Sequence, residues 1–236
     1  MHLLPAKIIL GPALLMQGKR VRKNIIKLPE ASGARQKLVE GASLRLLLIG
    51  DSSAAGGGVE TQQDALIGQI ERHMPDASLN WHVEARSGMT TPQMITHLQS
   101  LPEQKHDAVI SALGVNDITA GTDIEDWLDQ QRALIQDVQD RFKPDIFVMS
   151  GLPPVGRFPA LPNPLRWYLG QQAQHYDRAL RRLLAQQDFC HFLPLDFNDD
   201  PDRMAADGFH PGPGIYRDWG QRIAHVIQHK LVAEAA

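Results

Sequence analysis

Short apolar runs that alternate with amphipathic segments are the feature of this sequence that most restricts its fold. The runs are six or seven residues long and lie at 44–49, 79–85, 107–113, 145–151 and 189–195. Apolar residues at helical spacing predict helices over 62–74, 91–101, 122–142, 165–187 and 214–232. Strands that are apolar throughout need helices on both faces of their sheet, as parallel sheets have. The alternation therefore predicts an α/β fold, with βαβ units in a doubly wound, three-layer sandwich.

Composition excludes several classes of protein. The 236 residues carry a formal net charge of -3, so no overall basic field points to a nucleic-acid partner. The single cysteine, Cys190, cannot form an internal disulfide, and its apolar surroundings predict a small core residue. Paired Cys or His residues at zinc-binding spacing are absent from the sequence, so we expect no metal. No stretch reaches the roughly 18 apolar residues that a membrane span needs.

The first 43 residues differ in character from the rest. Nine Lys and Arg residues against two Glu occur up to Arg45. The apolar run 8–16 is short, contains Pro12 and precedes the positive charges, which is the reverse of a signal peptide. We expect a cytoplasmic protein with an N-terminal extension, 1–43, that packs on a main domain, 44–236. Two interpretations of the extension stay open: a solvated basic arm, or an interfacial segment that docks peripherally on anionic lipid. The first is favoured, because the apolar and basic residues form blocks instead of a helical stripe.

The loops after the strands should hold any chemistry, because ligands of such sheets bind at the carboxyl ends of the strands. The first of these loops follows the buried run in "LLLIGDSSAAGGG" and carries two serines and three consecutive glycines. A phosphate cradle is one interpretation, but neither GK[ST] nor GxGxxG fits. A structural turn explains the glycines alone. The third interpretation is a nucleophilic serine, with glycines that let backbone and substrate approach closely.

A nucleophilic serine needs a base, and the base needs an orienting acid. Asp207 and His210, three residues apart in "DGFHP", supply both. A tetrahedral oxyanion also needs preorganised donors. Gly88 in "RSGMT" could offer its backbone N–H and Asn116 in "GVND" its side-chain amide. Each feature alone has an ordinary alternative: a surface Asp–His contact, a turn glycine, or an asparagine that caps its own turn.

Together the motifs GDS, loop glycine, GxND and DGxHP occur in one order at successive strand ends. This combination resembles the GDSL-type or SGNH hydrolase family over about residues 44 to 225. The resemblance implies a flavodoxin-like α/β/α sandwich with a five-stranded parallel sheet over the hydrolase domain 44–236. It further implies Ser52 as nucleophile, His210 as base and Asp207 as acid. The oxyanion hole would consist of the N–H groups of Ser52 and Gly88 and the amide of Asn116, with no cofactor.

The expected function is hydrolysis of carboxylic esters, small or acyl, through an acyl-enzyme, as in lipase- and esterase-like acylhydrolases. A carbohydrate acetylesterase or an acyl-thioesterase could use the same site. A non-catalytic anion-binding module is the alternative from another class. The partner is a small-molecule ester, and the sequence does not give the oligomeric state. Proline-rich residues 151–170, with Phe158, Trp167 and Tyr168, either roof the substrate pocket or form a rigid surface connection.

Overall fold

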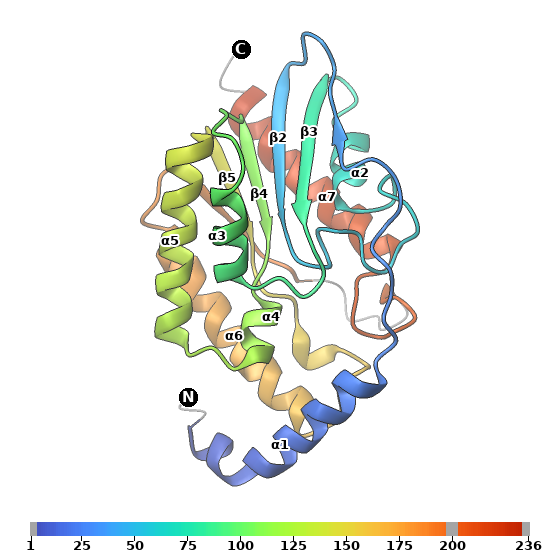
Figure 1. Ribbon diagram of the computed structural model, residues 1–236, viewed down its shortest axis with the longest axis vertical. Helices are drawn as coiled ribbons and strands as arrows, with labels where there is room; N and C mark the ends of the chain where they lie inside the picture. The colour runs from blue at the N-terminus through green and yellow to red at the C-terminus, as the bar shows by residue number, and fades with distance from the viewer. Residues whose placement is uncertain (1–3, 197–202, 233–236) are drawn as a thin grey trace.

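A central sheet organises the computed structural model, which describes residues 4–196 and 203–232 (Figure 1). Its six strands are β1 (Gln36–Lys37), β2 (Leu44–Gly50), β3 (Leu79–Ala85), β4 (Ala108–Ala112), β5 (Ile146–Ser150) and β6 (Cys190–Leu193). The strand order is β1-β3-β2-β4-β5-β6, and β2 to β6 are mutually parallel. These five parallel strands are the five predicted from the apolar runs. The predicted count of five is wrong by one strand, because the short β1 adds to the edge of the sheet and pairs antiparallel with β3.

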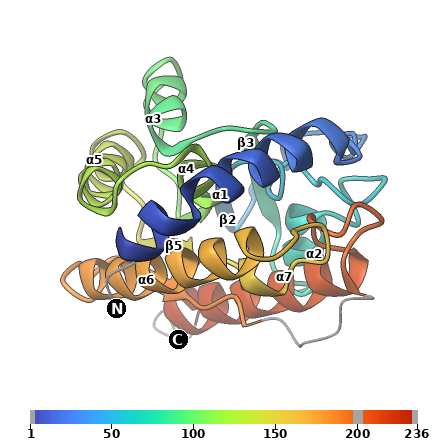
Figure 2. The same ribbon diagram turned by 90° about the horizontal axis from the view of Figure 1, so that it is seen from below.

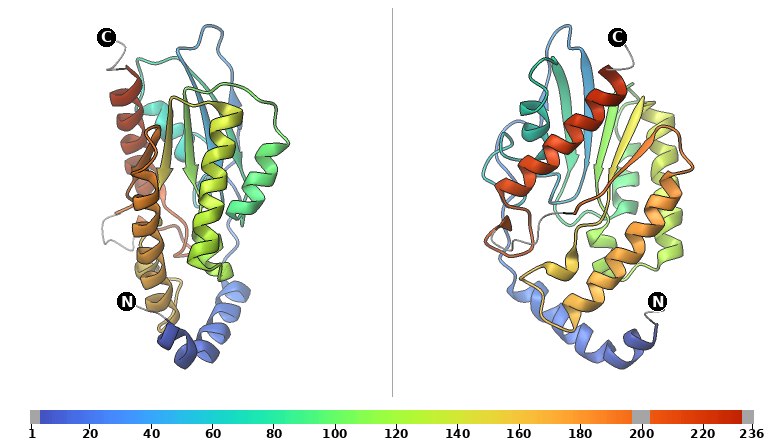
Figure 3. Two further views of the ribbon diagram at one scale, coloured as in Figure 1. Left: turned by 90° about the vertical axis from the view of Figure 1, so that its left-hand side faces the viewer. Right: turned by 180° about the vertical axis from the view of Figure 1, so that it is seen from behind.

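Helices cover both faces of the sheet and make the predicted three layers (Figure 3). The helices α3 (Thr91–Gln99), α5 (Ile124–Phe142) and α6 (Leu165–Leu184) share one apolar core with side chains such as Leu47 and Ile49 of β2. The helices α2 (Leu66–Arg72) and α7 (Pro213–Ile227) share the other core with Leu46 and Leu48. Successive residues of a strand point to opposite faces, so a strand that is apolar throughout supplies both cores.

The order of the strands fixes where a ligand can bind. The chain moves from β2 to β3 on one side and then returns to β4 on the other side of β2. The loops after β2 and β4 therefore diverge, and a crevice opens between them at the carboxyl edge of the sheet. The loop after β2 holds Ser52, and the one after β4 leads into the short helix α4 (Val115–Ala120), which holds Asn116.

Besides β1, three further elements were not predicted from the sequence. Helix α1 (Leu4–Asn24) runs across the carboxyl edge of the sheet, at the bottom of Figure 1, and Figure 2 shows it from below. Helix α4 has only six residues, and a single 3₁₀ turn, η1, spans Val155–Arg157. The last helix ends earlier than predicted and continues as a π-helical turn, Gln228–Val232. Within the described ranges, no helix is long and apolar enough to cross a membrane.

Candidate active site

Ser52 lies in a tight turn at the carboxyl end of β2. The N–H of Asp51 still donates to Ala112 O of β4 at 3.1 Å, as if the strand continued. The chain then turns back, and the N–H of Gly57 donates to Ser52 O at 2.7 Å. The turn leaves Ser52 half-buried at the mouth of the crevice, where the fold predicts a ligand.

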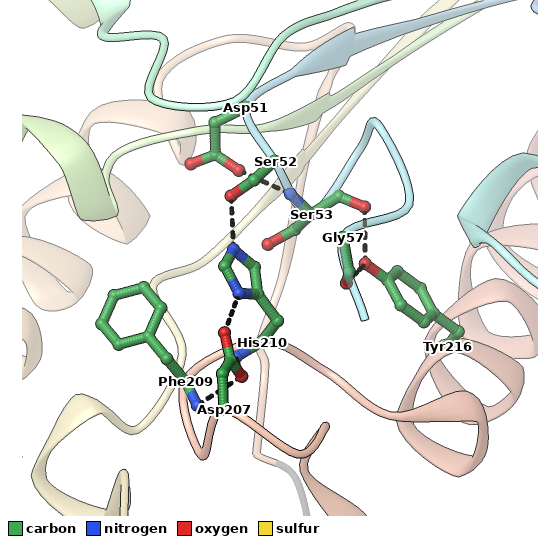
Figure 4. Close-up of polar contacts among 8 residues, drawn as sticks. All are labelled: Asp51, Ser52, Ser53, Gly57, Asp207, Phe209, His210 and Tyr216. Atoms are coloured by element: carbon green, nitrogen blue, oxygen red, sulfur yellow. Dashed lines mark hydrogen bonds and ion pairs between the residues drawn. The ribbon is translucent and has the colours of Figure 1, made fainter. Parts of the chain in front are cut away.

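The imidazole of His210 links this serine to an acid (Figure 4). Its Nε2 lies 2.9 Å from Ser52 Oγ, although the two residues are 158 positions apart in the chain. Its Nδ1 lies 2.5 Å from Asp207 Oδ2. The structure thus brings together the three residues that the sequence motifs singled out as a catalytic group.

The carboxylate of Asp207 is held by more than the imidazole. Its second oxygen, Oδ1, accepts the backbone N–H groups of Phe209 and His210, both at 3.0 Å. Burial alone would raise the pKa of Asp207, but these hydrogen bonds and the one to the imidazole outweigh it and lower the pKa. Asp207 is therefore charged at neutral pH and can fix the tautomer of His210.

The loop that carries Asp207 and His210 is closed by its own backbone and fastened to α7. The N–H of Ala205 donates to His210 O at 2.9 Å, and Gly208 turns the chain with a φ of +65°, where glycine is favoured. Before the loop, Arg203 donates to Asp218 Oδ2 at 2.5 Å and to Gly214 O at 2.7 Å. The imidazole is thus positioned by a braced loop.

Asn116 projects from the first turn of α4 toward the loop after β2. Its Nδ2 donates to Asp51 Oδ2 at 3.1 Å and to Met89 O at 3.0 Å. Asp51 also accepts the N–H of Ser53 at 2.9 Å. These contacts fix the amide plane beside the turn that holds Ser52.

Sequence reasoning missed this role of Asp51. Its position directly before Ser52 in the GDS motif was the available signal, but its contact with Asn116 joins residues 65 positions apart. Burial raises the pKa of Asp51 to about 6, although the hydrogen bond from Ser53 acts against the shift. A buried carboxylate with these two donors serves to position the asparagine.

Gly88 lies exposed in the loop after β3 with a φ of +81°. Both sides of this loop are tied to the site: Arg86 N–H donates to Gly50 O at 3.3 Å, and Met89 O accepts Asn116. Its role as an oxyanion donor stays a prediction. Next along the site, Asp117 accepts both the N–H and the hydroxyl of Thr91 at 3.0 Å, which anchors α4 to the start of α3.

The three glycines after Ser52 let other parts of the protein approach closely, as the sequence predicted for the backbone, and the approach of a substrate stays a prediction. A Cβ on Gly57 would lie 3.0 Å from His210 Cδ2, and one on Gly58 would lie 2.3 Å from Pro211 O. Gly56 faces Ala31 and Ala65 in the same way. The buried hydroxyl of Tyr216 donates to two carbonyl oxygens of the serine loop, Ser53 O at 3.0 Å and Gly57 O at 2.7 Å (Figure 4). The serine loop and the histidine loop are therefore packed directly on each other.

A small, mostly apolar pocket of about 40 Å³ opens beside Ser52 and His210. The rings of Phe158 and Phe209 form part of its wall and meet edge to face, with centroids 5.2 Å apart. Phe158 was a predicted substrate contact, and Phe209 was not, although it lies inside the DGFHP motif. Trp219 is buried in the core that α7 shares with the sheet, and it also lines the pocket.

The other two predicted substrate contacts lie elsewhere. Trp167, which is partly exposed, lines an open groove that adjoins the pocket and shares Pro153 and Leu195 with it. Tyr168 is buried in the core between the sheet and α6 and lines neither cavity. The proline-rich segment thus contributes to the pocket at one end and to the core at the other.

Cys190 is partly buried, and burial raises the pKa of its thiol to about 12, which leaves it unreactive. Among the residues that the structure describes, no group of His, Cys, Asp or Glu is arranged to hold a metal ion.

The model of the GDSL-like lipase/acylhydrolase family matches residues 48–217, which is most of the chain. The chain belongs to the GDSL-like lipase/acylhydrolase family. Family membership identifies this GDSL-like protein as a carboxylic ester hydrolase. No curated protein sequence matches the chain significantly.

Solved structures show the same fold for this GDSL-like hydrolase. A carbohydrate esterase family 2 enzyme with a carbohydrate-binding domain, from Corynascus thermophilus (Myceliophthora fergusii), aligns with a TM-score of 0.66 and 17% identity, over 83% of this chain and 69% of the other. An acetyl xylan esterase variant from Geobacillus stearothermophilus aligns with a TM-score of 0.61 and 17% identity, over 81% and 97%. The psychrotrophic esterase EstA of Pseudoalteromonas sp., in a structure inhibited by monoethylphosphonate, aligns with a TM-score of 0.56 and 16% identity, over 81% and 98%.

Proposed function

We propose that the protein is a serine esterase that hydrolyses short-chain carboxylic esters through an acyl-enzyme. The observation that carries the proposal is the continuous chain of contacts from Ser52 Oγ through His210 to Asp207. A serine hydroxyl becomes a competent nucleophile when a positioned base removes its proton. An acid on the far nitrogen of that base completes the arrangement of a Ser-His-Asp triad.

In the acylation step, Ser52 Oγ attacks the ester carbonyl carbon while its proton moves to His210 Nε2. The new imidazolium is stabilised by the charged Asp207. The carbonyl oxygen becomes an oxyanion, which the N–H groups of Ser52 and Gly88 and the amide of Asn116 stabilise. The oxyanion then reforms the carbonyl, the ester C–O bond breaks, and His210 returns the proton to the leaving alcohol.

In the deacylation step, water takes the place of the alcohol. His210 removes a proton from that water, and the resulting hydroxide attacks the acyl carbon bound to Ser52 Oγ. Collapse of the second oxyanion releases the carboxylic acid, and the proton on His210 restores the Ser52 hydroxyl.

The size of the pocket favours a short acyl group. About 40 Å³ beside Ser52 holds no more than a few atoms. The adjoining groove with Trp167 gives the alcohol part of the ester an open exit. A sugar acetate is the second candidate, favoured by this aromatic side chain beside the pocket and by the acetyl xylan esterase among the proteins of the same fold.

A fluorophosphonate reagent tests the proposed function. We expect one molecule to bind covalently per chain, at Ser52, and labelling to disappear in His210→Ala. A panel of nitrophenyl esters should show higher kcat/KM for acetate and butyrate than for decanoate. A chain that takes no label and hydrolyses none of these esters would be an anion-binding module, whereas a preference for acyl thioesters would favour the thioesterase alternative.

Asn116→Ala is expected to lower kcat for nitrophenyl acetate by about a hundredfold or more, since one donor to the oxyanion is lost. KM should change little, because the ground-state carbonyl makes weaker contacts than the oxyanion. Asn80→Ala is the matched control, because Asn80 accepts the N–H of Val39 at the opposite edge of the sheet. A kcat within twofold of the parent in a folded Asn116→Ala variant would contradict the oxyanion role.

A further inference from the structure

Helix α1 lies on the same end of the molecule as Ser52. The amide of Gln17 donates to Asn163 O at 2.8 Å and accepts Leu165 N–H at 3.0 Å, which ties α1 to the start of α6. Arg22 donates to Thr119 O of α4, the helix that carries Asn116, at 2.9 Å. Figure 2 shows α1 crossing this end of the molecule. Whatever contacts the outer side of α1 is therefore brought close to the crevice.

The inner side of α1 is apolar and packed, with Leu14 buried and Leu10 and Val21 against the same core. The outer side is also apolar over its first half. Seven large apolar side chains are exposed in the described ranges, and four of them lie on α1: Ile8 at 70%, Ile9 at 77%, Leu15 at 69% and Met16 at 67%. Water contact at four neighbouring aliphatic side chains is unfavourable, so this surface is suited to an apolar partner.

The second half of the outer side is basic. Lys19, Arg20 and Lys23 are exposed and form no ion pair within the described residues, and Leu4–Asn24 contains no acidic residue. Spaced along a helix of 3.6 residues per turn, these cations continue the side on which the four aliphatic residues lie. We call this surface the α1 face: Ile8, Ile9, Leu15, Met16, Lys19, Arg20 and Lys23.

We propose that the α1 face docks on an anionic membrane surface and presents the Ser52 pocket to esters carried by the lipid layer. Aliphatic side chains that enter the acyl region and adjacent cations at the headgroups are the two contributions that hold an interfacial helix on anionic lipid. A second copy of the chain fits less well, because two α1 faces would set cations against cations. Docking needs no catalysis; that the substrate is an amphiphilic ester rests on the proposed function.

The test measures binding of the full chain to vesicles, in the Ser52→Ala background so that lipid is not hydrolysed. We expect cosedimentation with phosphatidylcholine vesicles that contain phosphatidylglycerol, and little with phosphatidylcholine alone. Lys19→Gln/Arg20→Gln/Lys23→Gln should weaken the partition coefficient by at least about tenfold. Ile9→Ser/Leu15→Ser should weaken it to a similar degree, and high salt should weaken the parent more than the triple variant.

Two controls lie at the opposite edge of the sheet. Leu38→Ser removes an equally exposed apolar side chain, and Lys105→Gln removes an exposed cation that pairs with Asp145. Both should bind vesicles like the parent. Equal binding by the triple variant, or no binding of the parent to anionic vesicles, would overturn the proposal. So would sedimentation velocity that shows dimers lost on substitution of the α1 face, because a second copy would then cover it.

Hydrolysis of soluble nitrophenyl acetate by the parent enzyme separates the two proposals. Vesicle binding without hydrolysis would leave the docking surface standing and reject the esterase. Hydrolysis without vesicle binding would support the esterase and reject the docking surface. If both hold, an acetate ester of a long-chain alcohol in anionic vesicles should be cleaved at least about tenfold faster than in phosphatidylcholine vesicles, and the triple variant should lose this difference.

Discussion

Ser52→Ala is expected to lower kcat/KM for nitrophenyl acetate by at least about ten-thousandfold. The hydroxyl lies 2.9 Å from His210 Nε2, and no other hydroxyl of the described chain contacts that nitrogen. Without it no acyl-enzyme can form, and only the oxyanion donors remain to assist direct attack by water. The change removes one half-buried oxygen, so thermal unfolding followed by circular dichroism should stay close to that of the parent.

Ser53→Ala is the matched control for this experiment. Ser53 is adjacent in the same turn. Its backbone N–H donates to Asp51 and its carbonyl accepts Tyr216, and the substitution keeps both hydrogen bonds, although it removes the weaker contribution of the Ser53 hydroxyl to Asp51. The Ser53→Ala variant should retain fluorophosphonate labelling and most of the hydrolysis. If Ser52→Ala stayed within tenfold of the parent while folded, the nucleophile would have to be another group.

Asp207→Asn is expected to lower kcat by about a thousandfold to ten-thousandfold. The amide oxygen can still accept the N–H groups of Phe209 and His210 in place of Oδ1. The amide nitrogen then replaces Oδ2 opposite His210 Nδ1 and donates to it. The imidazole would carry its proton on Nε2, the nitrogen that must accept the proton of Ser52, so the base is lost while the shape of the site is kept.

The same substitution should change how stability depends on pH. The pKa of Asp207 is lower in the folded protein than its ordinary value of 3.8. Its carboxylate therefore stabilises the fold fully above pH 3.8 and loses that contribution as the pH falls through the folded pKa. Thermal unfolding should separate the parent from Asp207→Asn at pH 7, and the difference should shrink in strong acid.

Asp64→Asn controls for the loss of a partly buried carboxylate, because Asp64 bonds the hydroxyl of Thr61 and lies outside the pocket. This variant should keep kcat near that of the parent. A kcat for Asp207→Asn within tenfold of the parent would mean that another group orients His210.

The sequence was most informative where burial is complete. A strand such as Ala108–Ala112 is buried at every position, so all of its residues but Ser111 are apolar, and the run is visible without any alignment. Polar residues at the ends of these strands stand out for the same reason. The loops with Ser52, Asn116 and His210 could thus be recognised one by one, and their order allowed them to be combined.

Other features depend on contacts that a local pattern does not contain. The strand Gln36–Lys37 is two exposed residues whose pairing with β3 decides its conformation. Helix α1 escaped prediction because its inner and outer sides are both apolar over the first half, which hides the helical period. The role of Asp51 could not be predicted, because its carboxylate contacts Asn116 only once α4 packs beside it. The burial of Tyr168 could not be predicted either, because it depends on how α6 packs on the core.

The contact between Gly57 and Gly58 on one loop and His210 and Pro211 on the other has a consequence for the timing of catalysis. With no side chain between them, nucleophile and base cannot separate unless one backbone leaves the other. An arriving ester therefore meets machinery that is already assembled, and it expends no binding energy on bringing the reacting groups together. The rate of turnover should then be set by the chemical steps and by product release. The surface around the entrance of the pocket takes no part in assembling the reacting groups, so it can be adapted to where the substrate is found.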